Sequence, residues 1–495
     1  MKKSDTDLVL KKMLQNGGEF AEIYFEESES AGFTFVDKKV DAASSGMVSG
    51  CGLRLIKNEE TYFASQSASS VATMFSLAAK LSESTGNYKI STAELQRTKR
   101  PQILNLKSFL VFLCKLRVSA VTKFFQGSVE SSEYNSPIKI ESFSVSKLTE
   151  DLQSYIKVIE NIDKNLRQRS LQIKQISFQL SAGRKSFFVA NSEKINISSK
   201  RTSAIFMIAI VVSDGKITQT AHEVIAEDSL QKIKFENIEK VSEIAYKRAT
   251  DLLNIAVPSP AGEMPVVISS SASGTMIHEA IGHSLEADAV QKGISPVYLG
   301  KIGKKVANER ITVIDDSTIE HSRGSYQHDD EGTPSQKTVL VENGVLKNYL
   351  YDLFTAKKDK VKSTGNGRRE SYHCKPIPRM SNTYIAPGKD NPEEILQSVQ
   401  KGIFVQKMGG GQVNTANGDF IFEVEEGYEI IDGKLGKMLR NASLIGNGPE
   451  ILNSIDMVGT DLGWQPGTCG KDGQGVPVLD GQPTLRIPKI TVGGV

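Results

Sequence analysis

The sequence predicts an α+β protein with an N-terminal mixed α/β domain, in which helices pack on a sheet, and a C-terminal, mainly antiparallel β domain that carries a helix with two histidines. Three observations support this. Helical periodicity and strand-like alternation are intermixed in the first half. Short strands and glycine-rich turns dominate the second half. The linker "VPSPAGEMP" separates them, so we place the domains at residues 1–255 and 256–495.

In the first domain the pattern predicts four strands early in the chain, a block of strands later, and several amphipathic helices. Asn191-Ser192 is a predicted hairpin turn inside the strand block. The early strands are "FAEIYFEES", "GFTFVDKKVD", "GMVSGCGLRLIKN" and "ETYFASQ"; the strand block covers residues 171–212; the helices cover residues 1–18, 70–85, 146–168 and 238–256.

In the second domain a strand at residues 264–270 leads into the histidine segment. Two hairpins follow, because Asn-Gly and Asp-Gly dipeptides between alternating segments are strong signals for tight turns. Their tips are Asn343-Gly344 and Asp432-Gly433.

Composition excludes several classes of protein. The 60 Lys and Arg nearly balance the 58 Asp and Glu, so no charge excess indicates nucleic acid or a membrane surface as a partner. The longest apolar run, Ala204–Val212, is far shorter than the ~20 residues of a membrane-spanning helix and predicts a buried strand. The start of the chain has no signal-peptide pattern. Four scattered cysteines (51, 114, 374 and 469) form no disulfide framework, which predicts a cytoplasmic location.

The segment "MIHEAIGHSLEAD" places His278 and His283 five residues apart. In a regular α-helix such residues lie about 140° apart and point in different directions. A single π-type turn, or a loosened backbone at Gly282, would bring both imidazoles to one side. Otherwise one histidine is a core residue and the other faces solvent.

Glu279 follows the first histidine, at the position where metal hydrolases hold a general base. A hydrolytic zinc needs three protein ligands and one open position. The spacing leaves the third ligand open. The candidates are Glu286, Asp288, His373, Cys374 and Cys469.

Cys469 lies in "WQPGTCGKDGQGVP", which reads as a loop, and Lys471 nearby would favour the thiolate that binds metal. Gly409, Gly410 and Gly411 predict either tight turns or exposed backbone alongside which a peptide can lie. No stretch has the spacing of a phosphate-binding loop. The segment "HDDEGTP" predicts a mobile acidic turn rather than a second metal site. Arg368 and Arg369 are candidates for binding a substrate carboxylate, or ordinary surface arginines.

Several motifs together resemble the TldD/PmbA family, the so-called modulators of DNA gyrase, which are peptidases. They are "HEAIGHSLEAD", "GNGRRESY", "PIPRMSNTYIAPG", "MGGGQVNTANGDFIFEVEEGY", "LIGNGPEIL", "PGTCGKDGQGVP" and the closing "ITVGG", in that order. The resemblance is dense from Met264 to Gly494 and loose before that. It implies that this chain is the active, TldD-like type, because the metal-free PmbA-like type lacks the histidine segment.

The resemblance further implies that His278, His283 and Cys469 bind Zn²⁺ and that Glu279 is the base. It implies a homodimer, or a heterodimer with a PmbA-like subunit, that encloses the site and holds small or unfolded peptides as an added strand, without DNA contact. Tyr372 and His373 are guesses for the oxyanion donor. The alternative functions are a non-catalytic binding protein with a structural zinc and a hydrolase of some other amide.

Overall fold

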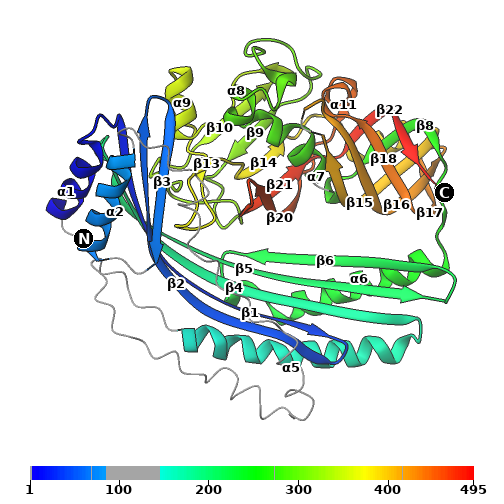
Figure 1. The fold of residues 1–495 in the computed structure, drawn as a ribbon. Coiled ribbons are helices and arrows are strands. Elements are labelled where there is room, and N and C mark those ends of the chain that lie inside the picture. Colours follow the sequence, from blue (N-terminus) through cyan, green and yellow to red (C-terminus); the bar gives the residue numbers. More distant parts are fainter. Residues whose placement is uncertain (1–2, 68–69, 85–144, 273, 415, 495) are drawn as a thin grey trace.

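The computed structural model describes residues 3–67, 70–84, 145–272, 274–414 and 416–494 (Figure 1). Cys114 lies outside the described residues. Within the described residues, none of the other three cysteines, Cys51, Cys374 and Cys469, forms a disulfide. Within the described ranges, no helix is both long and apolar enough to cross a membrane.

A curved, antiparallel six-stranded sheet forms the N-terminal part, with the strand order β3-β2-β1-β4-β5-β6. Figure 1 shows α5 and α6 lying along one face of this sheet and α1 and α2 beside its β3 end. The elements are α1 (Lys3–Leu14), β1 (Phe20–Val36), β2 (Lys39–Lys57), β3 (Glu60–Ser67), α2 (Val71–Ser84), α5 (Val145–Arg169), β4 (Ile173–Asn191), β5 (Asn196–Ser213), β6 (Thr218–Glu227) and α6 (Phe235–Asn254).

The predicted helices and the hairpin turn after Asn191 are confirmed. The first predicted strand and the start of the second form one strand, β1, and the second also contains the turn at Asp37 and Lys38 that leads into β2. The polar stretch "ESESA" looks like an interruption in the sequence. In the structure β1 continues through it, because both neighbouring strands pair with it: Ser28 lies opposite Val48 of β2 and Lys185 of β4. A polar stretch inside a central strand is therefore held by its backbone pairing.

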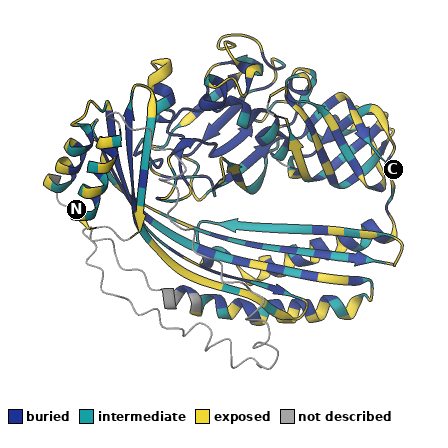
Figure 2. Cartoon of the chain, in the orientation of Figure 1, coloured by how far each residue is buried: buried dark blue, intermediate teal, exposed yellow. Residues whose placement is uncertain are grey.

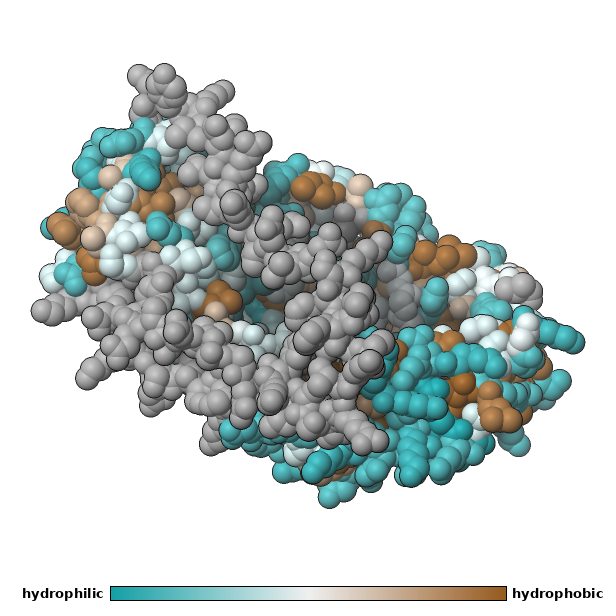
Figure 3. Space-filling model, turned by 60° about the horizontal axis from the view of Figure 1, so that its bottom comes forward, coloured by the Kyte–Doolittle hydropathy of each residue, from teal (hydrophilic) through white to brown (hydrophobic). Residues whose placement is uncertain are grey.

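Alternation along the strands decides which face is covered. In β5 every second residue from Ala204 to Val212 is buried, and these side chains pack with apolar residues of α5 and α6 in one core (Figure 2). The outer sides of such helices carry polar residues. Figure 3 shows mainly hydrophilic residues at the lower right, with hydrophobic ones scattered among them.

The C-terminal part is β-rich, as predicted, and mainly antiparallel. One sheet has six strands in the order β11-β10-β9-β14-β21-β20, and the other has eight, following β15-β8-β22-β18-β16-β17-β7 with β19 beside β22. The strands of the first sheet are β9 (Val313–Asp316), β10 (Lys337–Glu342), β11 (Val345–Leu346), β14 (Asn382–Ile385), β20 (Gly463–Lys471) and β21 (Gln474–Gln482).

The eight-stranded sheet and the remaining short elements complete this part. Its strands are β7 (Val257–Pro258), β8 (Gly262–Ile268), β15 (Lys401–Val413), β16 (Asp419–Ile431), β17 (Lys434–Arg440), β18 (Ala442–Asn447), β19 (Met457–Val458) and β22 (Leu485–Gly493). A separate pair is β12 (Gly367–Arg368) with β13 (Ile377–Pro378), and the helices are α9 (Leu353–Asp359), α10 (Pro392–Gln397) and α11 (Gly448–Ser454).

Both predicted hairpin tips are confirmed. Asn343 and Gly344 have φ angles of 47° and 79°, and Asp432 and Gly433 have 50° and 73°. Two consecutive positive φ angles define the tight turn that matches strand twist. The predicted domain boundary between residues 255 and 256 lies between α6, which ends at Asn254, and β7, which begins at Val257.

Candidate metal centre

The histidine segment is a short, irregular helix. It consists of α7 (Thr275–Ile277), a π-helical turn (His278–Gly282), a 3-10 turn (His283–Leu285) and α8 (Ala287–Gln291). The backbone N–H of His283 donates to the carbonyl of His278, which is the i to i+5 bond of a π turn. The two imidazole centroids are 4.9 Å apart. The predicted π turn is therefore confirmed, and it brings the rings together.

Glycines allow neighbouring segments to pack closely on this turn. A Cβ on Gly282 would lie 2.1 Å from Met380 Sδ, and a Cβ on Gly448, where α11 begins, would lie 2.6 Å from the carbonyl of Ala280. Ile277 and Ile281 are fully buried in the C-terminal core. The π turn therefore packs against close glycine contacts on one side and the hydrophobic core on the other. This packing fixes the orientation of the turn.

Cys469 lies in strand β20, and the prediction that it lies in a loop is wrong. Strands β20 and β21 form a hairpin that turns at Asp472 and Gly473, with φ angles of 50° and 71°. The glycines and Pro466 of β20 hide the strand, because these residues have low strand propensity. The side chain of Cys469 is buried in the same core as the histidine segment.

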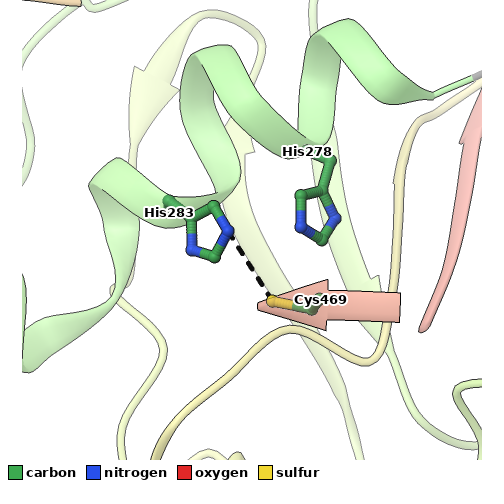
Figure 4. Close-up of side chains that lie close together, drawn as sticks. All are labelled: His278, His283 and Cys469. Carbon is green, nitrogen blue, oxygen red and sulfur yellow. Dashed lines mark hydrogen bonds between the residues drawn. The ribbon is translucent and has the colours of Figure 1, made fainter. Parts of the chain in front are cut away.

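His278, His283 and Cys469 converge on one point from two distant segments (Figure 4). Their ligand atoms lie within 4.8 Å of one another, and His283 Nε2 is 3.6 Å from Cys469 Sγ. A tetrahedral zinc with the usual bond lengths separates a nitrogen and a sulfur ligand by about 3.6 Å. The donor set and its spacing therefore fit zinc.

A carboxylate holds the far side of each imidazole. His278 Nδ1 is 2.9 Å from Asp480 Oδ1, and His283 Nδ1 is 3.0 Å from Glu286 Oε2. Such pairs orient histidine ligands and leave Nε2 for the metal. Gly274, with φ of 61°, makes the first pair possible, since a Cβ there would lie 2.2 Å from Asp480 Cβ.

The pKa shifts show that negative charge surrounds the two imidazoles. Burial disfavours the charged forms of Cys469, His278 and His283. At Cys469 the two histidines outweigh burial and lower the pKa of the thiol to about 6. Against the same burial, Glu286 and the sulfur raise the pKa of His283 to about 10, and Asp480 raises that of His278. This thiolate and these two carboxylates form a pocket of negative charge that a divalent cation neutralises.

Glu286 and Asp288 are not among the converging ligand atoms. Glu286 is buried, not a solvated helix residue, and Lys471 lies 3.0 Å from it and 2.5 Å from Asp288. Against burial, the Lys471 ammonium and the His283 imidazole lower the pKa of Glu286 to about 2. The contacts of Lys471 are thus with these carboxylates rather than with the thiol that we expected it to favour.

Glu279 lies in the π turn and is partly exposed. Across the described ranges its carboxylate makes no hydrogen bond or ion pair.

The remaining candidates lie elsewhere. Tyr372 is packed against the N-terminal sheet, with its hydroxyl 2.8 Å from Ser67 Oγ, and its ring stacks on His373. Cys374 follows in a turn, where its N–H donates to the carbonyl of Ser371. Neither His373 nor Cys374 belongs to the group of His278, His283 and Cys469. The glycines Gly409–Gly411 lie inside β15 rather than in a turn.

The acidic turn and the paired arginines are both buried, contrary to expectation. Asp329, Asp330 and Glu331 are fully enclosed, and Arg369 forms an ion pair with Glu22 of the N-terminal sheet. Arg368 donates instead to the carbonyls of Met380 and Pro477. Two of the acidic residues contact the N-terminal sheet: Asp330 pairs with Arg201 and Glu331 pairs with Arg54.

Sequence reasoning missed two residues of the site. Asp480 stands 202 positions after His278 and carries no local signal. Arg379 donates to the carbonyls of Cys469 and Gln474 and so anchors the β20–β21 hairpin. The sequence carries no direct signal for either residue. The one indirect signal is that a glycine-rich hairpin needs other residues to fix its position.

Two family models match the chain. The model described as PmbA/TldA metallopeptidase C-terminal domain covers residues 261–494, and the one described as PmbA/TldA metallopeptidase domain 1 covers residues 21–83. These descriptions define the class of the protein as a metallopeptidase. The chain belongs to the PmbA/TldD family, which confirms the resemblance seen in its motifs.

Named relatives agree. A metalloprotease TldD homolog of Buchnera aphidicola is 33% identical over 99% of this chain and 96% of its own length. A zinc metalloprotease TldD homolog of Saccharolobus solfataricus is 31% identical over 61% of this chain and 68% of its own length. These names support a peptidase that uses a metal.

Solved structures share the fold. A Thermotoga maritima protein described as a candidate modulator of DNA gyrase has a TM-score of 0.71 at 18% identity, over 99% of this chain and 100% of that one. TldE from Thermococcus kodakarensis has a TM-score of 0.69 at 19% identity, with the same coverage. The α+β fold is therefore that of TldD and TldE proteins.

Proposed function

We propose that this metallopeptidase is zinc-dependent, with His278, His283 and Cys469 as ligands and Glu279 as the general base. The observation that carries the proposal is the convergence of the three donors, two of them backed by carboxylates. When bound, zinc supplies a Lewis acid that polarises a peptide carbonyl and activates a water molecule. Glu279 takes the proton of that water and passes it to the leaving amine nitrogen.

The substrate lies as an added strand beside the site in this proposal. Strand β20 is the last of its sheet, so within the described residues no strand pairs with its outer edge. Past Val405, β15 pairs with β16 and no longer with β8, so in the described part of the chain a second edge is unpaired at Gly409–Gly411. An extended peptide binds such edges through backbone hydrogen bonds. Small or unfolded peptides present that backbone, and folded proteins do not.

We further propose that the chain works as a dimer, either with itself or with a PmbA-like subunit, and that the dimer encloses the site. The shared fold with TldE supports this pairing. Light scattering of the purified chain, alone and mixed with a PmbA-like protein, measures which dimer forms.

Replacing Glu279 by Gln tests the role of the base. We expect hydrolysis of an unfolded peptide to fall by roughly 10²- to 10⁴-fold, because general-base catalysis contributes about that much. Zinc content, measured by elemental analysis, should stay at the wild-type level. Cleavage at the wild-type rate would remove Glu279 from this role.

The rival function is a non-catalytic binding protein that retains a structural zinc. Structural zinc sites are normally closed by four protein ligands, and the group found within the described residues offers three. Peptide digestion by the zinc-loaded protein, with the PmbA-like partner supplied, separates the two. Stoichiometric zinc without any cleavage would favour the rival.

A further inference from the structure

Three arginines donate hydrogen bonds to the backbone of the hairpin that carries Cys469. Arg323 Nε donates to the carbonyl of Gly467 at 3.0 Å, Arg368 Nη2 donates to that of Pro477 at 2.7 Å, and Arg379 donates to that of Cys469. Within the described residues, none of the three has a carboxylate at ion-pair distance. Arg368 and Arg379 are buried and Arg323 is partly buried. A guanidinium that is removed from water without a carboxylate is costly, so this arrangement suggests that a ligand supplies the missing negative charge.

Two of these arginines line a cavity of about 720 Å³. Its walls come from both parts of the molecule: strands β1, β4 and β5 on one side, and the loop that contains Arg323 with the start of β21 on the other. Lining residues from each wall are Ser28, Lys185 and Thr202, and Ser317, Arg323 and Pro477.

Arg323 and Arg368 line the cavity without a carboxylate at ion-pair distance within the described residues. Several other charged groups of the lining have partners. The ion pairs are Arg201 with Asp330, Arg369 with Glu22, Lys185 with Glu26, and Asp228 with Lys232 and His321. Glu370 accepts a hydrogen bond from the N–H of Gly475. Glu29 lies opposite Arg184 of the neighbouring strand but is buried with no hydrogen bond to its carboxylate oxygens in the described part of the chain, and burial raises its pKa despite the Arg184 cation. Lys200 and Glu320 are exposed to solvent.

Burial, together with the adjacent Arg368 cation, lowers the pKa of Arg323 to about 10. The group stays protonated near neutral pH. An anion placed against it would relieve both effects at once.

The hairpin is the common wall of this cavity and the metal centre. Thr468, whose hydroxyl is 3.4 Å from Arg323 Nη2, precedes Cys469, and successive strand residues face opposite sides. In a two-residue hairpin the residues flanking the turn, here Lys471 and Gln474, are a hydrogen-bonded pair. Counting back, the backbone N–H and C=O groups of Thr468 and Gly470 point out from the open edge of β20.

A peptide paired with this edge alternates its side chains between the two sides of the hairpin. A backbone carbonyl beside the metal centre therefore places a neighbouring side chain toward the cavity. We propose that Arg323, with Arg368 beside it, binds a carboxylate of the peptide substrate, so that the enzyme prefers a negative charge near the bond it cleaves.

This inference rests on the proposed peptidase function and adds a preference to it. The carboxylate has two possible sources, an acidic side chain or the C-terminus of the peptide. Four versions of one short peptide separate them: with Glu or with Gln next to the scissile bond, each with a free or an amidated C-terminus. Binding is measured by fluorescence anisotropy with the zinc-loaded Glu279→Gln protein, which is expected not to cut the peptides.

The parent protein should bind a carboxylate-bearing peptide roughly 10- to 100-fold more tightly than its neutral version, the range expected for a charge-assisted hydrogen bond. Arg323→Gln should remove that difference, and Arg323→Lys should keep part of it. The matched control is Arg310→Gln, because Arg310 is exposed and its bridge to Asp390 is 3.5 Å long. That control should bind like the parent.

Equal binding of all four peptides by the parent would overturn the proposal, even if Arg323→Gln failed to fold. Discrimination that survives Arg323→Gln would overturn it as well. Cleavage of the neutral peptide by the zinc-loaded wild-type protein, with the PmbA-like partner supplied, reports separately on the peptidase function. A protein that discriminates in binding but cleaves none of the peptides would therefore refute the function and leave the carboxylate site standing.

Discussion

At the scale of single residues, the candidate site shows which parts of a metal centre are local in sequence. His278, Glu279 and His283 belong to one segment, so their chemistry could be read from spacing. Cys469 could only be offered among several candidates until the resemblance favoured it. Asp480 could not be predicted, because an aspartate in a strand carries no sequence signal for a role at a metal site. Its role is visible only in the fold, which places it 2.9 Å from His278 Nδ1.

Replacing Asp480 by Asn tests this placement. We expect zinc affinity to fall by about 10- to 100-fold, because the amide holds the imidazole with a weaker, uncharged hydrogen bond. Competition with a coloured chelator measures the affinity. The matched control is Asp456→Asn, which alters an ion pair with Arg486 outside the site and should leave the affinity unchanged. Equal affinities in both variants would show that Asp480 does not support a ligand.

At the scale of elements, the π turn was predictable and the β20 strand was not. A spacing of five residues between two histidines demands an unusual turn if both are to serve one ion, so the geometry follows from the hypothesis. Strand β20 contains three glycines and a proline, and its pairing with β21 forms it despite this composition. Tertiary pairing overrides propensity most easily in strands.

Gly274→Ala tests how tightly the site helix is set against β21. Its φ is 61°, and a Cβ would lie 2.4 Å from the carbonyl carbon of Asp480, so a backbone must move. We expect a loss of about 2–4 kcal/mol in the free energy of unfolding, together with weaker zinc binding.

Gly293→Ala is the control for that variant. Gly293 has a φ of 68°, but a Cβ there meets open space. It should cost only the backbone strain, about 1–2 kcal/mol, and leave zinc binding intact. Chemical denaturation and chelator competition give the two readouts. Identical effects of the two substitutions would show that crowding against Asp480 is unimportant.

At the scale of the whole molecule, buried charges join the two parts of the chain. Arg54 of β2 lies 2.8 Å from Glu22 of β1 and 2.5 Å from Glu331, and Glu22 also pairs with Arg369. The sequence showed these residues as ordinary charges of a balanced surface. Their burial depends on how the two parts meet, which no local pattern encodes, whereas the α+β class and the β-rich second half follow from periodicity alone.

Arg54→Met should destabilise the protein by about 3–5 kcal/mol, because it leaves Glu22 and Glu331 buried without their shared partner. Adding Glu331→Gln should recover part of the loss. Urea denaturation followed by fluorescence and circular dichroism measures it. Breaking the exposed bridge between Arg169 and Glu243 with Arg169→Met should cost at most about 1 kcal/mol. An equally small effect of Arg54→Met would mean that the buried network contributes little.

The distance along the chain between the two halves of the metal centre has a consequence for biosynthesis. The sulfur of Cys469 comes 186 positions after His283. A growing polypeptide therefore carries the paired imidazoles for a long interval before the thiolate leaves the ribosome. On the ligand set that we propose, the metal site stays incomplete during that interval, so the chain gains hydrolytic activity only after this residue has been synthesised and has folded into β20.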